Sequence, residues 1–332
     1  MLRSRYALVA GLPVGLGLLA LSLLASVRFG AAEIGTADVI GAFTAYDGSQ
    51  DDIIIRTLRV PRAIIAALVG ASLAVAGAIM QGLTRNPLAE PGILGINAGA
   101  ALAVVAGIFL FGVSSLSGYA VFAFVGAGAT AVVVYGLGSI GRGGMSPMRI
   151  TIAGAAMMTL LTSLTTGVLI ISRQTLEQIR FWLAGSVAGR DLDLLLQVLP
   201  YMTVGLLVAL AISRQITTLS LGGDVATGLG QRTGLTKAAA ALVVVLLAGS
   251  AVAIAGPIAF VGLIVPHLVR FFVGVDYRWI LPYSAVAGAI LLVWSDVASR
   301  LVLSPQEIPV GVTTALLGAP VFIYLARFKV KR

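Results

Sequence analysis

Cysteine is absent from the 332-residue sequence, and histidine occurs only once, at His267. Disulfides, thiolate metal ligands and thiol nucleophiles are therefore excluded, and a single histidine leaves little scope for metal chemistry. The sequence also lacks the G-x-x-x-x-G-K-[ST] loop that holds ATP phosphates and the H-E-x-x-H zinc motif. We therefore expect no catalytic, cofactor-binding or metal site in this chain, which argues against a membrane enzyme.

Charged residues are scarce, at 11%, whereas hydrophobic residues make up 59% and the mean hydropathy is +1.04. Soluble domains carry about 25% charged residues, and no soluble core of this length needs so much apolar residue. The 40 glycines suit close helix packing in lipid. The composition therefore predicts an all-α polytopic membrane protein, and the net charge of +9 fits membrane topology better than nucleic-acid binding.

Ten apolar segments predict about ten transmembrane helices in a single permease domain over residues 1–332. The first segment resembles a signal peptide, but its length of about 22 residues favours a retained helix. The eighth has only about 16 residues, fewer than the roughly 20 that a perpendicular span needs. The segments lie at 6–27, 61–83, 93–113, 117–139, 150–172, 194–213, 237–256, 258–273, 280–301 and 309–327.

The distribution of basic residues predicts that both termini are cytoplasmic. In this orientation most of the 22 lysines and arginines, including every lysine, lie on the cytoplasmic side. Topology alone does not explain the arginines that remain on the outer side.

Two apolar segments resemble each other, VGASLAVAGAI (69–79) and AGSAVAIAGPI (248–258), with glycine, alanine and isoleucine at matching positions. They belong to the second and seventh segments, an odd number of crossings apart, so they should cross the membrane in opposite directions. The pattern predicts an inverted repeat, as transporters use. Chance similarity in sequence rich in alanine and glycine is the alternative.

The outer arginines include Arg59 and Arg62 in RTLRVPR (56–62), together with Arg300. Pro61 favours a helix start, so Arg59 and Arg62 can share the outer end of one helix. These residues are either solvated loop charge or a receptor for an acidic partner or an anionic ligand.

Asp296 is the one clear acidic residue within a span. It lies four residues before Arg300 on the same helix face, so we expect the two to pair. Such pairing argues against a proton-coupled carrier, which needs acidic partners inside its spans.

Two polar segments are expected on the cytoplasmic side. LTRNPLAEPGILG (83–95) contains Pro87 and Pro91, which end the preceding helix, and is either a tight turn or the inner lip of a pathway. TTLSLGGDVATGLGQRTGLTK (217–237) is either a flexible connector or a short amphipathic docking helix for a soluble partner.

Several longer stretches resemble the FecCD-type permeases, the membrane subunits of ABC importers for iron-siderophores, haem and cobalamin. They are LRVPRAIIAALVGASLAVAGAIMQGLTRNPLAEPGILGINAGAAL (58–102), LSLGGDVATGLG (219–230), AVAIAGPIAFVGLIVPHLVR (251–270), DVASRLVL (296–303) and EIPVGVTTALLGAPVFIYLARF (307–328). The resemblance implies a type II ABC importer permease that forms the pathway with a second permease subunit, identical or homologous. It also implies two ATPase subunits, which would bind ATP and Mg²⁺, and a substrate-binding protein, with no nucleic acid.

The same resemblance implies roles for individual residues. Binding-protein docking is assigned to Arg59, Arg62 and Arg300. ATPase coupling, within segment 214–237, is assigned to Leu221, Gly222, Asp224, Ala226, Leu229 and Gly230. The cytoplasmic gate is assigned to Asn86, Leu88, Pro147 and Met148.

The expected function is that of a permease subunit that imports a ferric siderophore across the cell inner membrane by alternating access. Haem or cobalamin is the alternative substrate, and a stand-alone secondary carrier is the alternative class. Pro147 and Met148 stand where the cobalamin permease has small hydroxyl residues, which disfavours cobalamin.

Overall fold

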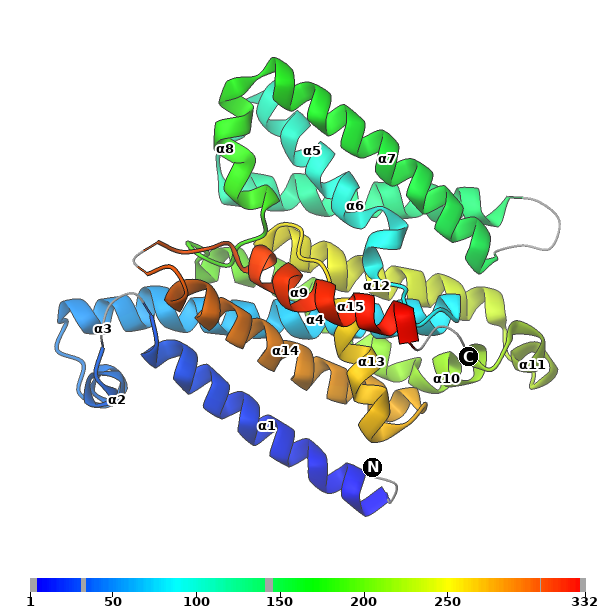
Figure 1. The fold of residues 1–332 in the computed structure, drawn as a ribbon, viewed down its shortest axis with the longest axis horizontal. Coiled ribbons are helices and arrows are strands. Elements are labelled where there is room, and N and C mark those ends of the chain that lie inside the picture. Colours follow the sequence, from blue (N-terminus) through cyan, green and yellow to red (C-terminus); the bar gives the residue numbers. More distant parts are fainter. Residues whose placement is uncertain (1–4, 31–33, 141–145, 305, 329–332) are drawn as a thin grey trace.

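The structure is a computed structural model that describes residues 5–30, 34–140, 146–304 and 306–328. Within these ranges the chain forms helices, turns and connecting segments, and no β-strand occurs. The long helices are gathered into an elongated bundle (Figure 1). The all-α fold that the composition predicts is thereby confirmed.

Each of the ten apolar segments contains one long helix. Seven helical segments of the described chain are long and apolar enough to cross a membrane, whereas α5, α13 and α15 are shorter. With 13 residues, α13 confirms that the eighth segment is too short for a perpendicular span. The ten helices are α1 (Arg5–Arg28), α4 (Val60–Thr84), α5 (Ile96–Phe111), α6 (Leu116–Ser139), α7 (Pro147–Ile171), α9 (Leu192–Ala211), α12 (Thr233–Ala255), α13 (Val261–Val273), α14 (Tyr277–Leu301) and α15 (Val310–Phe328).

Most short helices in the connecting segments were not predicted, the exception being α11 (Gly223–Gly228), which agrees with the docking helix offered as one alternative for segment 217–237. The others contain few apolar residues in a row, so the hydropathy pattern that identifies spans does not detect them. They are α2 (Thr36–Thr44), α3 (Gln50–Ile54), the π-helix η1 (Ile55–Arg59), the 3₁₀-helix η2 (Pro91–Leu94), α8 (Arg173–Leu183) and α10 (Ser213–Ser220).

Pro61 lies in the first turn of α4, as expected for a helix start, but the chain is already helical before it. The helical segment runs without a break from Gln50 to Thr84 and is π-helical over Ile55–Arg59. Proline has no N–H for the α-helical bond to the carbonyl four residues earlier. The wider π-helical turn just before Pro61 accommodates this gap, so the proline does not end the helix.

The centre of the bundle is α4, along which nearly every side chain is buried. Glycine allows other helices to approach it closely. Gly70 lies against the backbone of Gly288 in α14, and Gly77 lies against the backbone of Gly262 in α13. A side chain at either position of α4 would overlap the neighbouring backbone, so small residues hold these helices together as they do in lipid.

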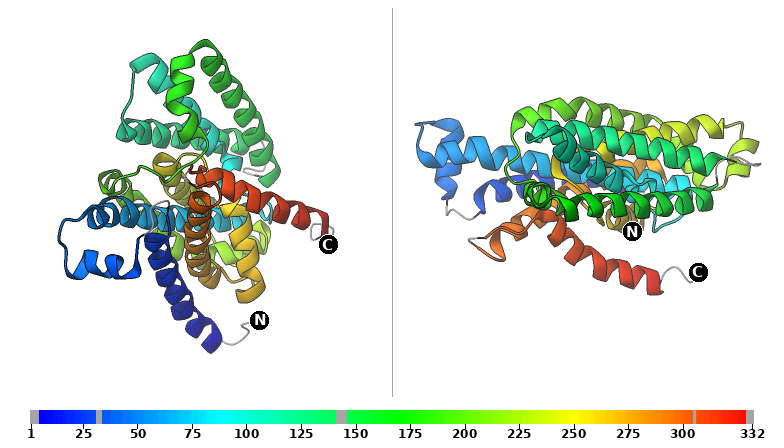
Figure 2. Two further views of the ribbon diagram at one scale, coloured as in Figure 1. Left: turned by 60° about the vertical axis from the view of Figure 1, so that its left-hand side comes forward. Right: turned by 90° about the horizontal axis from the view of Figure 1, so that it is seen from above.

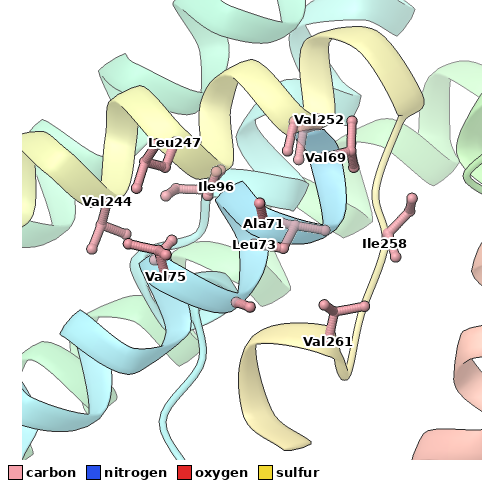
Figure 3. Packing of buried hydrophobic residues seen from close by; sticks show 14 of the residues in the cluster. Val69, Ala71, Leu73, Val75, Ile96, Val244, Leu247, Val252, Ile258 and Val261 are labelled. Carbon is pink, nitrogen blue, oxygen red and sulfur yellow. The ribbon is translucent and has the colours of Figure 1, made fainter. Parts of the chain in front are cut away.

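The two segments of the predicted repeat, in α4 and α12, run in opposite directions. Val69 lies beside Val252 near one end of the contact, and Val75 lies beside Val244 near the other (Figure 3). The local structures of the two segments differ near their C-terminal ends. Gly77 lies inside α4, whereas the matching residue Gly256 follows the last residue of α12 with a φ of 72°.

Other helices form the sides of the bundle. α5, α6, α7 and α8 make a layer on one side, and α1 flanks the opposite side (Figures 1 and 2). α1 and α7 bury only a small share of their apolar length within the chain. Their exposed faces are therefore free to meet lipid or another subunit.

Both termini of the described chain lie at the same end of the bundle as α10 and α11 (Figure 1). We call this the inner end. The opposite end, which holds Arg59, Arg62 and Arg300, we call the outer end.

Candidate functional site

At the outer end, one buried carboxylate joins two helices through two arginines. Asp296 of α14 is fully buried. Arg62 of α4 donates to it from Nε at 3.0 Å and from Nη2 at 2.8 Å. Arg300 forms a second ion pair with the carboxylate at 3.1 Å. The predicted pairing of Asp296 with Arg300 is confirmed, and Arg62 is a third member that sequence spacing did not reveal.

Arg59 and Arg300 also donate hydrogen bonds to the end of α1. Arg59 donates from Nη1 to the carbonyl oxygens of Val27 and Arg28, at 2.8 and 2.6 Å. Arg300 donates to the carbonyl oxygens of Ser26 and Phe29, at 3.1 and 2.9 Å. The last carbonyls of a helix have no partner within the helix, and cations near them are favourable. The two arginines therefore cap α1 and attach it to α4 and α14.

The predicted docking residues Arg59, Arg62 and Arg300 thus lie together, and they line one pocket of about 410 Å³. Much of their hydrogen-bonding capacity is directed to groups of this chain. Their role in docking a binding protein stays a prediction.

Two further members of the pocket were missed by the sequence analysis. Glu307 accepts from Arg62 Nη1 at 2.8 Å, and Arg190 enters from the loop between α8 and α9. No sequence pattern connects either residue with Arg62, because all three come together only through the packing of distant segments.

At the inner end, the predicted coupling segment forms two short helices rather than a flexible connector. α10 is followed by a turn at Gly222 with a φ of 136°, which favours glycine, and then by α11. Leu221 and Leu229 are 64% and 69% exposed, whereas Ala226 is buried against the chain.

This arrangement gives the inner end an exposed leucine pair. Asp224 lies in the first turn of α11 and is exposed, and Gly230 follows the helix at a φ of 79°. Two exposed leucines on a short ordered element suit contact with another protein. The coupling roles of these residues stay a prediction.

The segment 83–95 contains a tight turn. The Asn86 side-chain oxygen accepts from the Leu88 N–H at 3.0 Å, and its carbonyl accepts from the Ala89 N–H at 3.1 Å. A side-chain acceptor two residues before its donor is a standard way for asparagine to close a turn. Asn86 is exposed and Leu88 is half-buried.

The other predicted gate segment begins α7, with Pro147 as its first residue. Met148 is 71% exposed. A pocket of about 250 Å³ lies between three segments, the end of α4, the start of α7 and the coupling segment. It is lined by Leu83, Arg85, Ser146, Ile150, Leu219, Gly223 and Lys237. The structure therefore places the predicted gate and coupling segments side by side, and their roles stay predictions.

A chain of polar side chains links α10 to the middle of the bundle. Tyr277, at the start of α14, donates its backbone N–H to Thr217 Oγ1 in α10 at 3.0 Å. Arg270 of α13 donates from Nη2 to the Tyr277 hydroxyl at 3.0 Å and from Nη1 to the side-chain oxygen of Gln81. Gln81 in turn donates to the carbonyl of Leu263 at 3.1 Å. We call Thr217, Tyr277, Arg270 and Gln81 the inner polar chain.

The start of α13 contacts the predicted gate segment 83–95. Glu90 accepts from the backbone N–H of Phe260 at 3.4 Å, just before α13 begins. Burial raises the pKa of Glu90, and this hydrogen bond partly offsets the effect. Phe260 has a φ of 70°, which is strained for a residue with a side chain. α13 is thus connected to the gate loop at its start and to α10 near its end.

Long apolar helices through the bundle, with the ion-paired residues gathered towards its ends, are the architecture of a multi-pass membrane protein. The sequence matches the FecCD transport family over residues 18–328, and the chain belongs to this family.

Named relatives agree with this assignment. The chain is 52% identical over 306 residues to YfiZ of Bacillus subtilis, a probable siderophore transport system permease protein, and covers 92% of each chain. It is 48% identical over 323 residues to the iron(3+)-hydroxamate import system permease protein FhuB of the same organism, covering 97% of this chain and 84% of the relative. A solved structure of a metal-chelate type ABC transporter in an inward-facing conformation matches with a TM-score of 0.83 and 30% identity, over 95% of this chain and 98% of the other.

Proposed function

We propose that this chain is the permease subunit of an ATP-driven importer for a ferric siderophore. The observation that carries the proposal is the similarity, over more than nine-tenths of the chain, to permeases named for siderophore and iron-hydroxamate transport. The chain would line the translocation pathway together with a second permease subunit, identical or homologous. It would need no cofactor of its own.

The two ends of the bundle suit different partners. The exposed leucines of α10 and α11 would receive two ATPase subunits that bind ATP and Mg²⁺. The basic outer end would receive a substrate-binding protein. This assignment places the inner end, with both termini, in the cytoplasm and the protein in the cell inner membrane, in agreement with the distribution of lysine and arginine.

Transport would proceed by alternating access. ATP binding and hydrolysis would move the ATPase subunits, and α11 would pass this motion to the adjoining gate segments 85–88 and 146–150. A ligand or nucleotide shifts such an equilibrium only by binding the inward- and outward-facing states with different affinities. The chain would supply the contacts that differ between those states and perform no bond-making chemistry.

Reconstitution tests this proposal. The chain is purified from its native host under gentle detergent conditions, analysed by native mass spectrometry, and reconstituted with the co-purified subunits and binding protein in proteoliposomes. We expect an ATPase pair to accompany it and ⁵⁵Fe-siderophore uptake to require ATP. Uptake that persists without ATP, or a chain that repeatedly purifies alone while a known importer stays intact, would contradict the proposal.

Haem is the second candidate substrate because the family resemblance includes haem permeases. The same vesicles distinguish the two, since an excess of unlabelled haem suppresses iron-siderophore uptake only if both share the pathway. If the vesicles take up haem but no ferric siderophore, the substrate is haem.

A further inference from the structure

Arg190 is a buried cation whose terminal nitrogens have no partner in the described part of the chain. It lies in the short loop between α8 and α9 and is only 9% exposed. Its Nε donates to the carbonyl of Ser186 at 3.3 Å, and no hydrogen bond or ion pair is formed by Nη1 or Nη2 within the described residues. Burial lowers the pKa of Arg190, because desolvation disfavours its cation. Nη1 and Nη2 are not completely enclosed by protein, so they are available to an anion in the pockets that Arg190 lines.

The neighbouring carboxylates are already engaged. Asp191 follows Arg190 directly, but its Oδ1 accepts from the Leu194 N–H at 2.9 Å and caps α9. Glu307 is ion-paired with Arg62, at 2.8 Å. Arg190 shares the first pocket with Arg59, Arg62 and Arg300, and the charge of Asp191 only partly offsets the effect of burial on its pKa. The electrostatics of this position favour an external anion.

Arg190 separates two pockets at the outer end. One is the arginine-lined pocket of about 410 Å³, and the other has a volume of about 370 Å³. One part of the second pocket is apolar and aromatic, lined by Leu116, Tyr119, Phe181, Trp182 and Pro309. Gln178, Ser186 and Glu307 line the rest of it, beside Arg190. Arg190 therefore lines both a pocket that contains three other arginines and a pocket whose walls are partly apolar.

We propose that Arg190 and these two pockets form an entry subsite for an anionic ferric chelate, in which the guanidinium binds a carboxylate or catecholate oxygen and the apolar walls contact the organic body. This inference rests on the proposed import of ferric siderophores and narrows the substrate to negatively charged chelates. A carboxylate from a docked protein is the other conceivable anion. It would leave the apolar pocket unfilled, whereas an organic chelate matches both surfaces.

Direct binding tests the subsite without the binding protein. The complete permease–ATPase complex in lipid nanodiscs is titrated with an anionic ferric tricatecholate and with a neutral ferric trihydroxamate, and quenching of tryptophan fluorescence is followed. Trp182 lies in the wall of the second pocket and serves as the reporter. We expect the tricatecholate to bind more tightly than the trihydroxamate.

The variants separate charge at this position from charge at the outer end in general. Arg190→Gln should weaken tricatecholate binding about tenfold, because a charge-assisted hydrogen bond is lost. The affinity of Arg190→Lys for the tricatecholate should lie between those of wild type and Arg190→Gln, since lysine retains the charge without the planar guanidinium. Arg173→Gln is the matched control, because this arginine is exposed at the start of α8 and does not line the pockets. Binding of the neutral chelate should change in none of them.

Equal effects of Arg190→Gln and Arg173→Gln, or tighter binding of the neutral chelate, would overturn the proposal. A lower affinity of the binding protein for Arg190→Gln, measured by surface plasmon resonance, with unchanged chelate binding would make Arg190 a docking residue instead. Failure of the proposed function looks different. The wild-type complex would then bind the tricatecholate through Arg190 but import no ferric chelate on addition of ATP.

Discussion

The two ends of the bundle both bury arginine between helices, but they balance its charge in different ways. At the outer end, Arg62 and Arg300 share the fully buried carboxylate of Asp296. At the inner end, Arg270 donates to the neutral oxygens of Gln81 and Tyr277. Removing one member of a buried ion cluster leaves an uncompensated charge. The hydrogen bonds of Arg270 are charge-assisted, but their acceptors are neutral, so water can replace one of these acceptors without leaving a second charge unpaired.

This difference indicates different mechanical roles. The outer cluster joins α1, α4 and α14 with ionic contacts that would be expensive to separate during a transport cycle. The inner polar chain joins α10 to α13 through contacts that can rearrange at moderate cost. We therefore expect the outer arginine cluster to stay together as a rigid unit, while the inner end changes its contacts when the ATPase subunits move.

Removal of the buried carboxylate should have the largest effect. Asp296→Asn leaves Arg62 and Arg300 without their shared counter-charge, and we expect a loss of about 3–5 kcal/mol of stability. Thermal unfolding of the detergent-solubilised chain, followed by size-exclusion chromatography, measures it. Glu307→Gln serves as the control, because this carboxylate is 35% exposed and solvent can replace it. An Asp296→Asn protein as stable as Glu307→Gln would show that the cluster is not the structural centre of the outer end.

The same geometry changes how a proton-coupled carrier can be tested. The sequence points to Asp296 as the residue to replace in such a test, since it is the one clear acid in a span. Because the residue is enclosed by two arginines, loss of uptake in that variant would report unfolding as readily as loss of a proton site. Depletion of ATP in reconstituted vesicles distinguishes the two classes without disturbing the fold.

The inner polar chain should affect coupling more than folding. Arg270→Gln removes the cation that connects Gln81 with Tyr277, and we expect the ATP hydrolysed per imported substrate to rise several-fold while the subunits remain assembled. Tyr277→Phe removes a single charge-assisted hydrogen bond, worth about 1.5–3 kcal/mol, and should give a smaller change in the same direction. The readout is the ratio of ATPase rate to uptake rate in proteoliposomes. If the ratio is unchanged in both variants, the inner polar chain contributes to stability and not to coupling.

The exposed leucines of the coupling segment should affect assembly without affecting the fold. Leu229→Ser removes an apolar contact from a side chain that is 69% exposed, so the melting temperature of the isolated chain should not change. Association with the ATPase should weaken about tenfold if the leucine fills a pocket of the partner. The matched variant Ala226→Ser alters the buried face of the same helix and should lower stability instead. Equal ATPase affinity for wild type and Leu229→Ser would remove the proposed dock.

The sequence predicted the parts of this architecture that depend on local pattern. Long apolar runs identified all ten long helices, and the spacing of four residues predicted the pair of Asp296 and Arg300. Pro61 does lie in the first turn of α4, but the π-helical turn before it was not predicted. A short helix in segment 217–237 was one of two alternatives, and the other short helices were missed because their apolar faces are too brief to give a hydropathy signal.

The sequence could not predict contacts between segments far apart in the chain. Arg62 and Asp296 meet only because α4 and α14 pack through Gly70 and Gly288. Arg190 is likewise placed beside the arginine cluster by tertiary packing, and no local motif marks it. Each prediction about a site therefore needed the fold before its chemistry could be judged.

The smallest effect concerns docking at the outer end. Charge reversal at Arg59 and Arg62 would disturb the caps of α1 and the pair with Asp296, so a loss of docking in such a variant would not isolate the interface. Glu307→Gln is cleaner, because it removes one partly exposed acid and should change stability by only about 0.2–1 kcal/mol.

If acidic residues of a binding protein approach this end, removing Glu307 should raise the association rate severalfold at low salt and leave the dissociation rate nearly unchanged. Stopped-flow association at two ionic strengths measures the effect, which should diminish as salt screens it. An association rate that falls in Glu307→Gln would mean that the partner presents basic residues to this acid, and the outer arginines would then act within the chain alone.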